Sequence, residues 1–292
     1  MVKKGKSKKI DTKTEGKTNN LEGKIDTILG IKINSASTSS VLKFIENKIA
    51  KRVKIFIVTP NPEIVVQAQS DLLLASILNS AELSLPDGVG LVWASKWKEL
   101  FVRNPLARKL NPLAQAPRAG SQITSRVSGI DVMEAAIKKA AERGWRVFLL
   151  GGRPGVAEKA AENLRVQYPN IMVSNYDGPW LDSDGKPQNK KEEKKEREAI
   201  SKINAFKPYL LFVAYGAPKQ EKWVRSNYDK IETLVTMVIG GSLDYISGNV
   251  NRAPFWARRI GIEWLFRLAQ EPWRLGRQLA LIKFIWLVAK QG

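Results

Sequence analysis

Short apolar segments of strand length alternate with longer amphipathic segments along most of this chain, and glycine-rich turns join many of them. A strand buried on both faces is a continuous apolar run, whereas a helix that covers a sheet has apolar residues every three or four positions. Strand, turn and helix repeated in this order favour a parallel β-sheet with helices on both faces, an α/β fold. The expected strands are 53–58, 81–85, 146–150, 171–174, 209–214 and 233–239, and the expected helices are 63–79, 132–143, 156–168 and 192–206.

Three segments depart from this alternation. Residues 1–24 are rich in Lys, Thr and Asn and lack an apolar core, so we expect a disordered basic arm and no secretion signal. Residues 25–251 are expected to form the α/β domain, in which 96–124 is basic, contains several prolines and is expected to be an inserted loop. Residues 252–292 are expected to form a helical appendage.

The charged and reactive residues limit the chemistry. Lys and Arg number 48 against 28 acidic residues, a formal charge of +20, which attracts nucleic acid, anionic lipid or phosphorylated small molecules. The chain has no Cys and no His, which excludes thiol catalysis and a histidine base. A general base must then be Asp or Glu, or else Lys or Tyr. No window is apolar over the length that spans a bilayer, so we expect a cytoplasmic protein that can lie on a membrane surface.

Ligands of open parallel sheets bind beyond the carboxyl ends of the strands, and the residues there are the candidate site residues. Asp87 follows the expected strand 81–85 in the turn Pro86-Asp87-Gly88. An Asp in such a turn often serves only to form it. Its position beside glycines, in a chain without histidine, makes Asp87 the best candidate for a general base.

Other strand ends carry polar residues and glycines. Thr59 and Asn61 follow the strand 53–58, and Asn61 is equally suited to cap the next helix. The turn that starts Gly151-Gly152 opens a helix and is suited to hold a diphosphate. Gln220 is a candidate contact for a sugar or phosphate. The glycines Gly240 and Gly241 follow the last strand.

Two further acidic motifs keep alternatives open. Asp177 follows the strand 171–174, where a ribose-binding acid is expected, so a nucleotide-dependent oxidoreductase remains possible. The Asp182-Ser183-Asp184 motif matches a metal-binding pattern of sugar transferases, but its polar surroundings and Gly185 favour a surface turn. The positive charge is the only feature that favours a nucleic-acid-binding protein, and no nucleic-acid-binding module is recognisable.

The C-terminal segment combines basic residues with tryptophans. Basic residues and Trp on amphipathic helices suit a lipid headgroup layer, and the alternative is a helix docked by its aromatic side chains. The residues concerned are Arg252, Arg258, Arg259, Arg267, Arg274, Arg277, Lys283 and Lys290, with Trp256, Trp264, Trp273 and Trp286.

Seven stretches together resemble the WecG/TagA/CpsF family of glycosyltransferases. They run in the family's order and cover most of the chain from about Lys51. The stretches are TPNPEIVVQAQ (59–69), LPDGVGLVWASK (85–96), RVSGIDVMEAA (126–136), VFLLGGRPGVAEKAAENL (147–164), KPYLLFVAYGAPKQEKWV (207–224), VIGGSLDYISGNVNRAP (238–254) and GIEWLFRLAQEPWR (261–274).

The resemblance implies a Rossmann-like fold whose C-terminal appendage completes the site at the inner face of the cell membrane. It implies transfer of N-acetylmannosamine or a related sugar from a UDP-sugar to undecaprenyl-diphosphate-linked N-acetylglucosamine, for teichoic acid-like polysaccharides. The transfer is expected to invert the anomeric centre and to need neither metal nor cofactor. The implied partners are the donor, the lipid-linked acceptor, an anionic membrane surface and a possible second copy of the chain, with no nucleic acid.

The family's site residues carry over by motif. Asp87 matches the family's proposed base, while Thr59, Asn61, Arg126 and Gln220 match polar residues of its pocket. Tail arginines match residues that engage a diphosphate, and Arg252, Arg259 and Arg267 are the candidates. Two departures are Ser128, where the family usually has Thr, and the greater length of 96–124.

Overall fold

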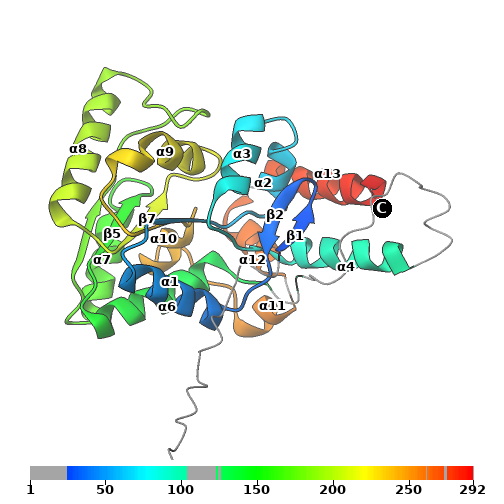
Figure 1. Cartoon of the computed structure of the whole chain (residues 1–292), viewed down its shortest axis with the longest axis horizontal. Helices are drawn as coiled ribbons and strands as arrows, with labels where there is room; N and C mark the ends of the chain where they lie inside the picture. Colours follow the sequence, from blue (N-terminus) through cyan, green and yellow to red (C-terminus); the bar gives the residue numbers. More distant parts are fainter. Residues whose placement is uncertain (1–24, 104–122, 124–125, 261, 273–274, 292) are drawn as a thin grey trace, which may run out of the picture.

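A six-stranded parallel sheet forms the centre of the protein (Figure 1). The computed structural model describes residues 25–103, 123, 126–260, 262–272 and 275–291. Every strand pair of the six is parallel, in the order β4-β3-β8-β7-β5-β6. The strands are β3 (Ile55–Val58), β4 (Leu83–Ser84), β5 (Val147–Gly151), β6 (Val173–Tyr176), β7 (Leu210–Ala214) and β8 (Val235–Val238). This sheet with its flanking helices confirms the predicted α/β, Rossmann-like class.

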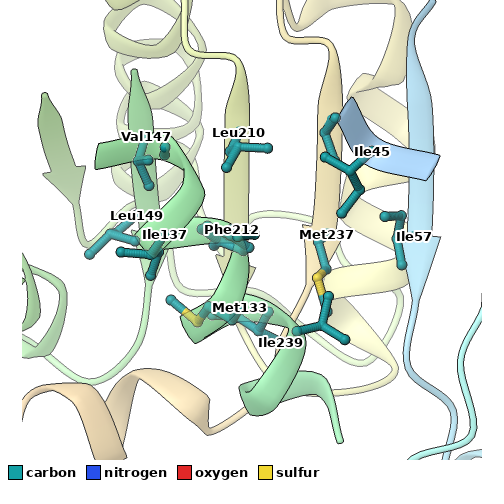
Figure 2. Packing of buried hydrophobic residues seen from close by; sticks show 14 of the residues in the cluster. Ile45, Ile57, Met133, Ile137, Val147, Leu149, Leu210, Phe212, Met237 and Ile239 are labelled. Atoms are coloured by element: carbon teal, nitrogen blue, oxygen red, sulfur yellow. The ribbon is translucent and has the colours of Figure 1, made fainter. Parts of the chain in front are cut away.

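The apolar runs are explained by burial on both faces of the sheet. In β3, Ile55 and Ile57 pack in one hydrophobic cluster, and Phe56 and Val58 pack in the other. Figure 2 shows part of the first cluster, in which the strand residues Leu149 and Phe212 lie beside the helix residues Ile137 and Met133. Alternate residues of a strand point to opposite faces, so only a fully apolar run can serve both clusters.

Helices cover both faces. The first cluster receives apolar side chains from α1 (Thr38–Ala50), α6 (Gly129–Arg143), α7 (Val156–Gln167) and α10 (Ser242–Ile246). The second receives them from α2 (Pro62–Gln67), α3 (Leu72–Ser80), α8 (Lys190–Phe206) and α9 (Lys219–Asn227, followed by the 3-10 turn Tyr228–Lys230). The single helix expected over 63–79 is two helices, because Asp71 accepts a hydrogen bond from the Leu74 N–H (2.9 Å) and starts a new helix.

A hairpin that the sequence did not reveal precedes the sheet. Strands β1 (Ile25–Ile28) and β2 (Ile31–Asn34) pair antiparallel around a turn at Leu29-Gly30, where both residues have positive φ. The Asn34 Oδ1 accepts a hydrogen bond from the Ser84 N–H (2.8 Å), which ties the hairpin to β4. The hairpin thereby extends the second cluster toward the strand that precedes Asp87.

The C-terminal segment is helical, as expected, and it packs on the domain. Its helices are α11 (Phe255–Arg259), α12 (Glu263–Gln270) and α13 (Leu275–Gln291). Helix α13 lies against α2 and α4 (Val89–Arg103), where it buries Phe284 and Val288 in the second cluster (Figure 1). The appendage is therefore joined to the core of the α/β domain.

The expected inserted loop begins as a helix. Helix α4 continues to Arg103, so 96–103 are helical, while 104–122 and 124–125 lie outside the described residues. The proposed basic arm, 1–24, also falls in the part that is not described. The boundary at 251/252 and the role of the insertion stay predictions.

Candidate active site

A cavity of about 670 Å³ opens at the carboxyl ends of the strands. Turns that follow all six strands of the sheet contribute to its wall, and α12 and α13 of the C-terminal segment close one side. The candidate residues on the wall are Thr59, Asn61, Asp87, Arg126, Gly152, Gln220, Gly240, Gly241 and Arg267. Of the other candidates, Gly151 and Arg252 lie off the wall, and the Arg259 side chain is outside the described residues.

Asp87 presents its carboxylate to this cavity. Its backbone N–H donates to the Pro60 carbonyl (3.0 Å), which fixes the turn after β4. The side chain is 35% exposed, and its Oδ1 lies 3.9 Å from the Arg126 Nε. Burial inside the cavity walls raises the pKa of Asp87 to about 6, and the nearby Arg126 opposes this rise. The carboxylate is therefore ionised at neutral pH and basic enough to accept a proton.

Arg126 links Asp87 to the C-terminal segment. Its Nη2 donates a hydrogen bond to the Glu263 Oε2 at the start of α12. Both side chains are largely buried, 19% and 12% exposed. Glu263 was not among the predicted site residues, although it is one of the few acidic residues of the basic C-terminal segment and lies in the motif stretch 261–274.

Gln220 connects two glycine turns. Its Oε1 accepts hydrogen bonds from the N–H groups of Gly216 (3.2 Å) and Gly240 (3.1 Å), and its Nε2 donates to the Glu221 Oε1 (3.0 Å). The residue is only 2% exposed. Its amide is engaged with the protein, so Gln220 fixes the turns after β7 and β8 relative to each other.

Replacing Gln220 by Leu is expected to lower the free energy of unfolding by about 1–3 kcal/mol, because two part-buried N–H groups lose their acceptor and each such hydrogen bond contributes roughly 0.5–1.5 kcal/mol. Urea denaturation measures this change. Gln167→Leu, at the exposed end of α7, is the matched control and should change stability by less than about 0.5 kcal/mol. Equal effects of the two variants would contradict the assigned role.

Gly151 is required for packing. Its φ is +95°, and an added Cβ would lie 3.0 Å from the Ala214 backbone and the Tyr215 ring. Its neighbour Gly152, with φ +94°, is on the cavity wall. Within the expected diphosphate cradle, the second glycine faces the cavity and the first packs against β7.

Arg267 brings a cation from α12 to the turn after β8. Its guanidinium lies against Gly241, where an added Cβ would overlap it, and over the Tyr245 ring, 4.8 Å from the centroid. Its Nε donates to the Glu271 Oε2 (2.7 Å), and its Nη2 lies 3.5 Å from the Asp244 Oδ2. Arg267 is thereby held at the cavity wall.

Arg252 has a different position. Its guanidinium pairs with Asp131 and with Glu134 (Nη1 to Oε2, 3.1 Å) on α6. It fastens the start of the C-terminal segment to the α/β domain, and its charge is directed to these carboxylates.

Thr59 and Asn61 combine structural contacts with a place on the wall. The Thr59 hydroxyl donates to the Val238 carbonyl (3.2 Å), and the Asn61 Oδ1 accepts from the Ile64 N–H (2.9 Å) and caps α2. The capping alternative for Asn61 is confirmed.

The acidic motifs after β6 serve the local backbone. The Asp177 Oδ2 accepts from the Gly155 N–H (3.1 Å) at the start of α7. The Asp182 Oδ1 accepts from the N–H groups of Asp184 and Lys186, and Asp184 pairs with Lys222 (3.0 Å), as expected for a surface turn. Within the described residues, no group of three Asp or Glu side chains is arranged to hold a metal ion.

Two tryptophans on the cavity wall were not among the predicted site residues. Trp180, after β6, is 52% exposed, and Trp264, on α12, is 42% exposed. Exposed indole rings offer flat apolar faces on which a base or sugar ring can stack. Single tryptophans in loops and helices carry no pattern that distinguishes them in a sequence.

The chain is similar to known proteins over most of its length. The model of the glycosyl transferase WecG/TagA/CpsF family matches residues 26–117 and 112–292. Proteins of Staphylococcus aureus strains MW2, NCTC 8325 / PS 47 and COL are 31% identical over 269 residues, covering 91% of this chain and 92% of each relative. Each of these relatives is named N-acetylglucosaminyldiphosphoundecaprenol N-acetyl-beta-D-mannosaminyltransferase.

Proposed function

Because the chain belongs to the WecG/TagA/CpsF family of glycosyltransferases, we propose that it moves N-acetylmannosamine, or a related sugar, from a UDP-sugar to undecaprenyl-diphosphate-linked N-acetylglucosamine. The observation that carries the proposal is the Asp87 carboxylate, which faces a cavity at the strand ends that tail residues, including the Arg267 guanidinium, help to line. The named acceptor of the relatives has free hydroxyl groups, and a sugar transfer to one of them requires a base.

Asp87 is the proposed base. It takes the proton of the attacking hydroxyl while that oxygen forms a bond to the anomeric carbon of the donor sugar. The bond from this carbon to the diphosphate oxygen breaks, and the electron pair leaves with UDP. A single displacement of this kind inverts the anomeric centre. The rise in the pKa of Asp87 makes it a better proton acceptor than an ordinary exposed Asp.

The proposed donor site lies between the glycine turns. Gly152, Gly240 and Gly241 line the cavity there, Gly240 has open space where a side chain would lie, and the Arg267 guanidinium against Gly241 supplies positive charge beside them. Hydrogen-bond donors and cations that are held in place before the reaction stabilise the negative charge that develops on a leaving group. We propose that Arg267 does this for UDP without a metal ion, and that Trp180 stacks on the base or sugar.

A donor screen tests this function. Purified full-length protein is mixed with a short-chain prenyl-diphosphate N-acetylglucosamine and single UDP-sugars, with and without a chelator. We expect UDP-N-acetylmannosamine or a close relative to add one sugar to the acceptor, as detected by mass spectrometry, at the same rate in both conditions. Sugar addition that stops with the chelator would contradict the metal-independent step.

The acceptor is lipid-linked, and the C-terminal segment exposes apolar side chains beside the cavity. The exposed residues are Phe255, Trp256, Ile260, Trp264, Leu265, Leu275, Leu279, Ile282, Ile285 and Trp286. Lys290 lies over the Trp286 ring, 5.2 Å from its centroid. In the part of the chain that the structure describes, no helix has the length and hydropathy to cross a bilayer. We propose that α11–α13 rest on the inner face of the cell membrane and deliver the acceptor to the cavity.

Replacing Ile282 and Trp286 together by Ser is expected to weaken binding to vesicles of anionic lipid by at least about tenfold, because each buried apolar side chain contributes roughly 1.5–3 kcal/mol. Both side chains are exposed on α13, at 66% and 59%. Vesicle co-sedimentation measures the effect. The rate of sugar transfer to a short-chain soluble acceptor should stay the same in this variant. The control is Val166→Ser, which changes an 83% exposed side chain of α7, a helix on the opposite side of the molecule from α13 in Figure 1. Equal loss in both variants would contradict the proposed surface.

A further inference from the structure

The C-terminal segment brings a carboxylate to the cavity as well as cations. Glu263 is the first residue of α12, and its side chain is 12% exposed on the cavity wall. Its Oε2 accepts a hydrogen bond from the Arg126 Nη2, and its Oε1 lies 3.9 Å from the Arg252 Nε. A buried carboxylate is costly unless cations pair with it, and two do so here.

Arg126 is shared unequally between two carboxylates. It is hydrogen-bonded to Glu263, whereas its Nε lies 3.9 Å from the Asp87 Oδ1, which is too far for a hydrogen bond. The Arg126 Nε has no hydrogen-bond partner among the described residues. An Arg guanidinium readily forms two parallel hydrogen bonds to one carboxylate, so Asp87 and Glu263 are alternative partners for the same group.

We propose that Glu263 is a positioning residue that holds Arg126 off Asp87 and so keeps the Asp87 carboxylate free to accept the proton of the acceptor hydroxyl. This inference rests on the proposed function, in which Asp87 is the base. It gives the C-terminal segment a role in the proton transfer itself, in addition to its proposed contact with lipid.

The charges around Asp87 explain why the partner of Arg126 matters. Burial raises the pKa of Asp87; Arg126 and Arg267 lower it, and Glu263 and Asp131 raise it. If Arg126 moved into direct contact, it would occupy the oxygens of Asp87 and typically lower that pKa by about 1–3 units. A carboxylate in such a pair is a weaker base. Because Glu263 sits on α12, the base is fully active only while this helix is docked.

The competing explanation is that Glu263 only fastens α12 to the domain. Two observables separate the explanations. Positioning predicts a change in the pH at which Asp87 titrates, with α12 still docked. Fastening alone predicts a loss of docking, which hydrogen exchange of the α12 amides reports.

The experiment compares Glu263→Gln with wild type in transfer to a short-chain acceptor across pH 4.5–8.5. We expect the acidic limb of kcat/KM to move down by about one pH unit or more, kcat to fall roughly three- to tenfold, and exchange in α12 to be unchanged. The control is Glu134→Gln, which removes a different ion pair between the domain and the tail, that with Arg252 (3.1 Å). Glu134→Gln should leave the acidic limb of kcat/KM at the same pH as in the wild type.

A second variant covers the case in which Glu263→Gln releases α12. In an Arg126→Gln background the guanidinium that Glu263 is proposed to hold is absent, so adding Glu263→Gln should shift the limb much less than it does alone. An unchanged limb in Glu263→Gln, or an equal shift in both backgrounds, would overturn the inference. If instead the wild type transferred no sugar, or Asp87→Asn kept full activity, the proposed function itself would fail.

Discussion

Replacing Asp87 by Asn is expected to lower the turnover number by about 10²–10⁴-fold, which is the usual contribution of a positioned base. Asn has nearly the same shape but cannot accept the proton of the acceptor hydroxyl. The affinity for UDP should change little, because the proposed diphosphate contacts are with the glycine turns and Arg267. Steady-state kinetics on a short-chain acceptor and calorimetric titration with UDP measure the two quantities.

The stability of this variant separates a catalytic role from a structural one. Burial raises the pKa of Asp87 above its usual value, so the fold favours the protonated form and loses stability as pH rises from about 4 to 6. An uncharged Asn should therefore leave the melting temperature at pH 8 unchanged or higher. The control is Asp184→Asn, in the exposed turn before α8, which should keep full activity. If Asp87→Asn lost turnover, UDP affinity and stability together, Asp87 would have a structural role and not the proposed catalytic one.

The second large effect is expected for Arg267→Met, which keeps an unbranched apolar stem and removes the guanidinium with its charge. Loss of one donor positioned at a developing charge costs about 3 kcal/mol, so kcat should fall about 10²-fold. UDP should also bind more weakly, because its diphosphate loses a cation at the turn after β8. Arg267→Lys keeps the positive charge but loses the planar guanidinium and its paired N–H groups, so it should retain part of the rate.

A matched control for Arg267 is Arg225→Met, which removes one positive charge from the exposed face of α9. It should leave kcat unchanged. Similar losses in both variants would mean that the overall charge of +20, and not a guanidinium at Gly241, favours the reaction. Hydrogen exchange of α12 in Arg267→Met shows whether its loss of rate follows from undocking of the helix.

The sheet could be predicted because both of its faces are buried. Strands such as β5 and β7 are buried at every residue, so their apolar runs stand out in the sequence. The β1/β2 hairpin could not be predicted in the same way. Its strands have four residues each, contain polar positions, and directly follow the basic segment 1–24, so no run of sufficient length marks them.

The position of the cavity followed from the rule that ligands bind at the carboxyl ends of parallel strands, and the candidates Asp87 and Gly152, chosen by this rule, lie on its wall. The partners of the site residues did not follow. Gln220 was expected to contact a ligand, but its amide bonds the backbone of two turns. Such pairing is set by how the turns after β7 and β8 approach each other, which local sequence does not encode.

The tail arginines show the same limit. Arg252 and Arg267 are the same residue type in one basic segment, and the sequence offered no way to separate them. Docking of α12 directs Arg267 to the cavity, while Arg252 pairs with acids of α6. The contact between Arg126 and Glu263 joins residues 137 positions apart, so it too depends on the tertiary fold.

The pH dependence of kcat/KM, measured in parallel for wild type and Asp87→Asn, shows whether Asp87 takes the proton of the acceptor hydroxyl. Because burial raises the pKa of Asp87 to about 6, the wild-type value should rise through that pH as the carboxylate loses its proton, and then level off. The residual activity of Asp87→Asn should show no such rise. A limb near pH 6 that persists in Asp87→Asn would show that some other group takes the proton, and would contradict the proposed chemistry of this site.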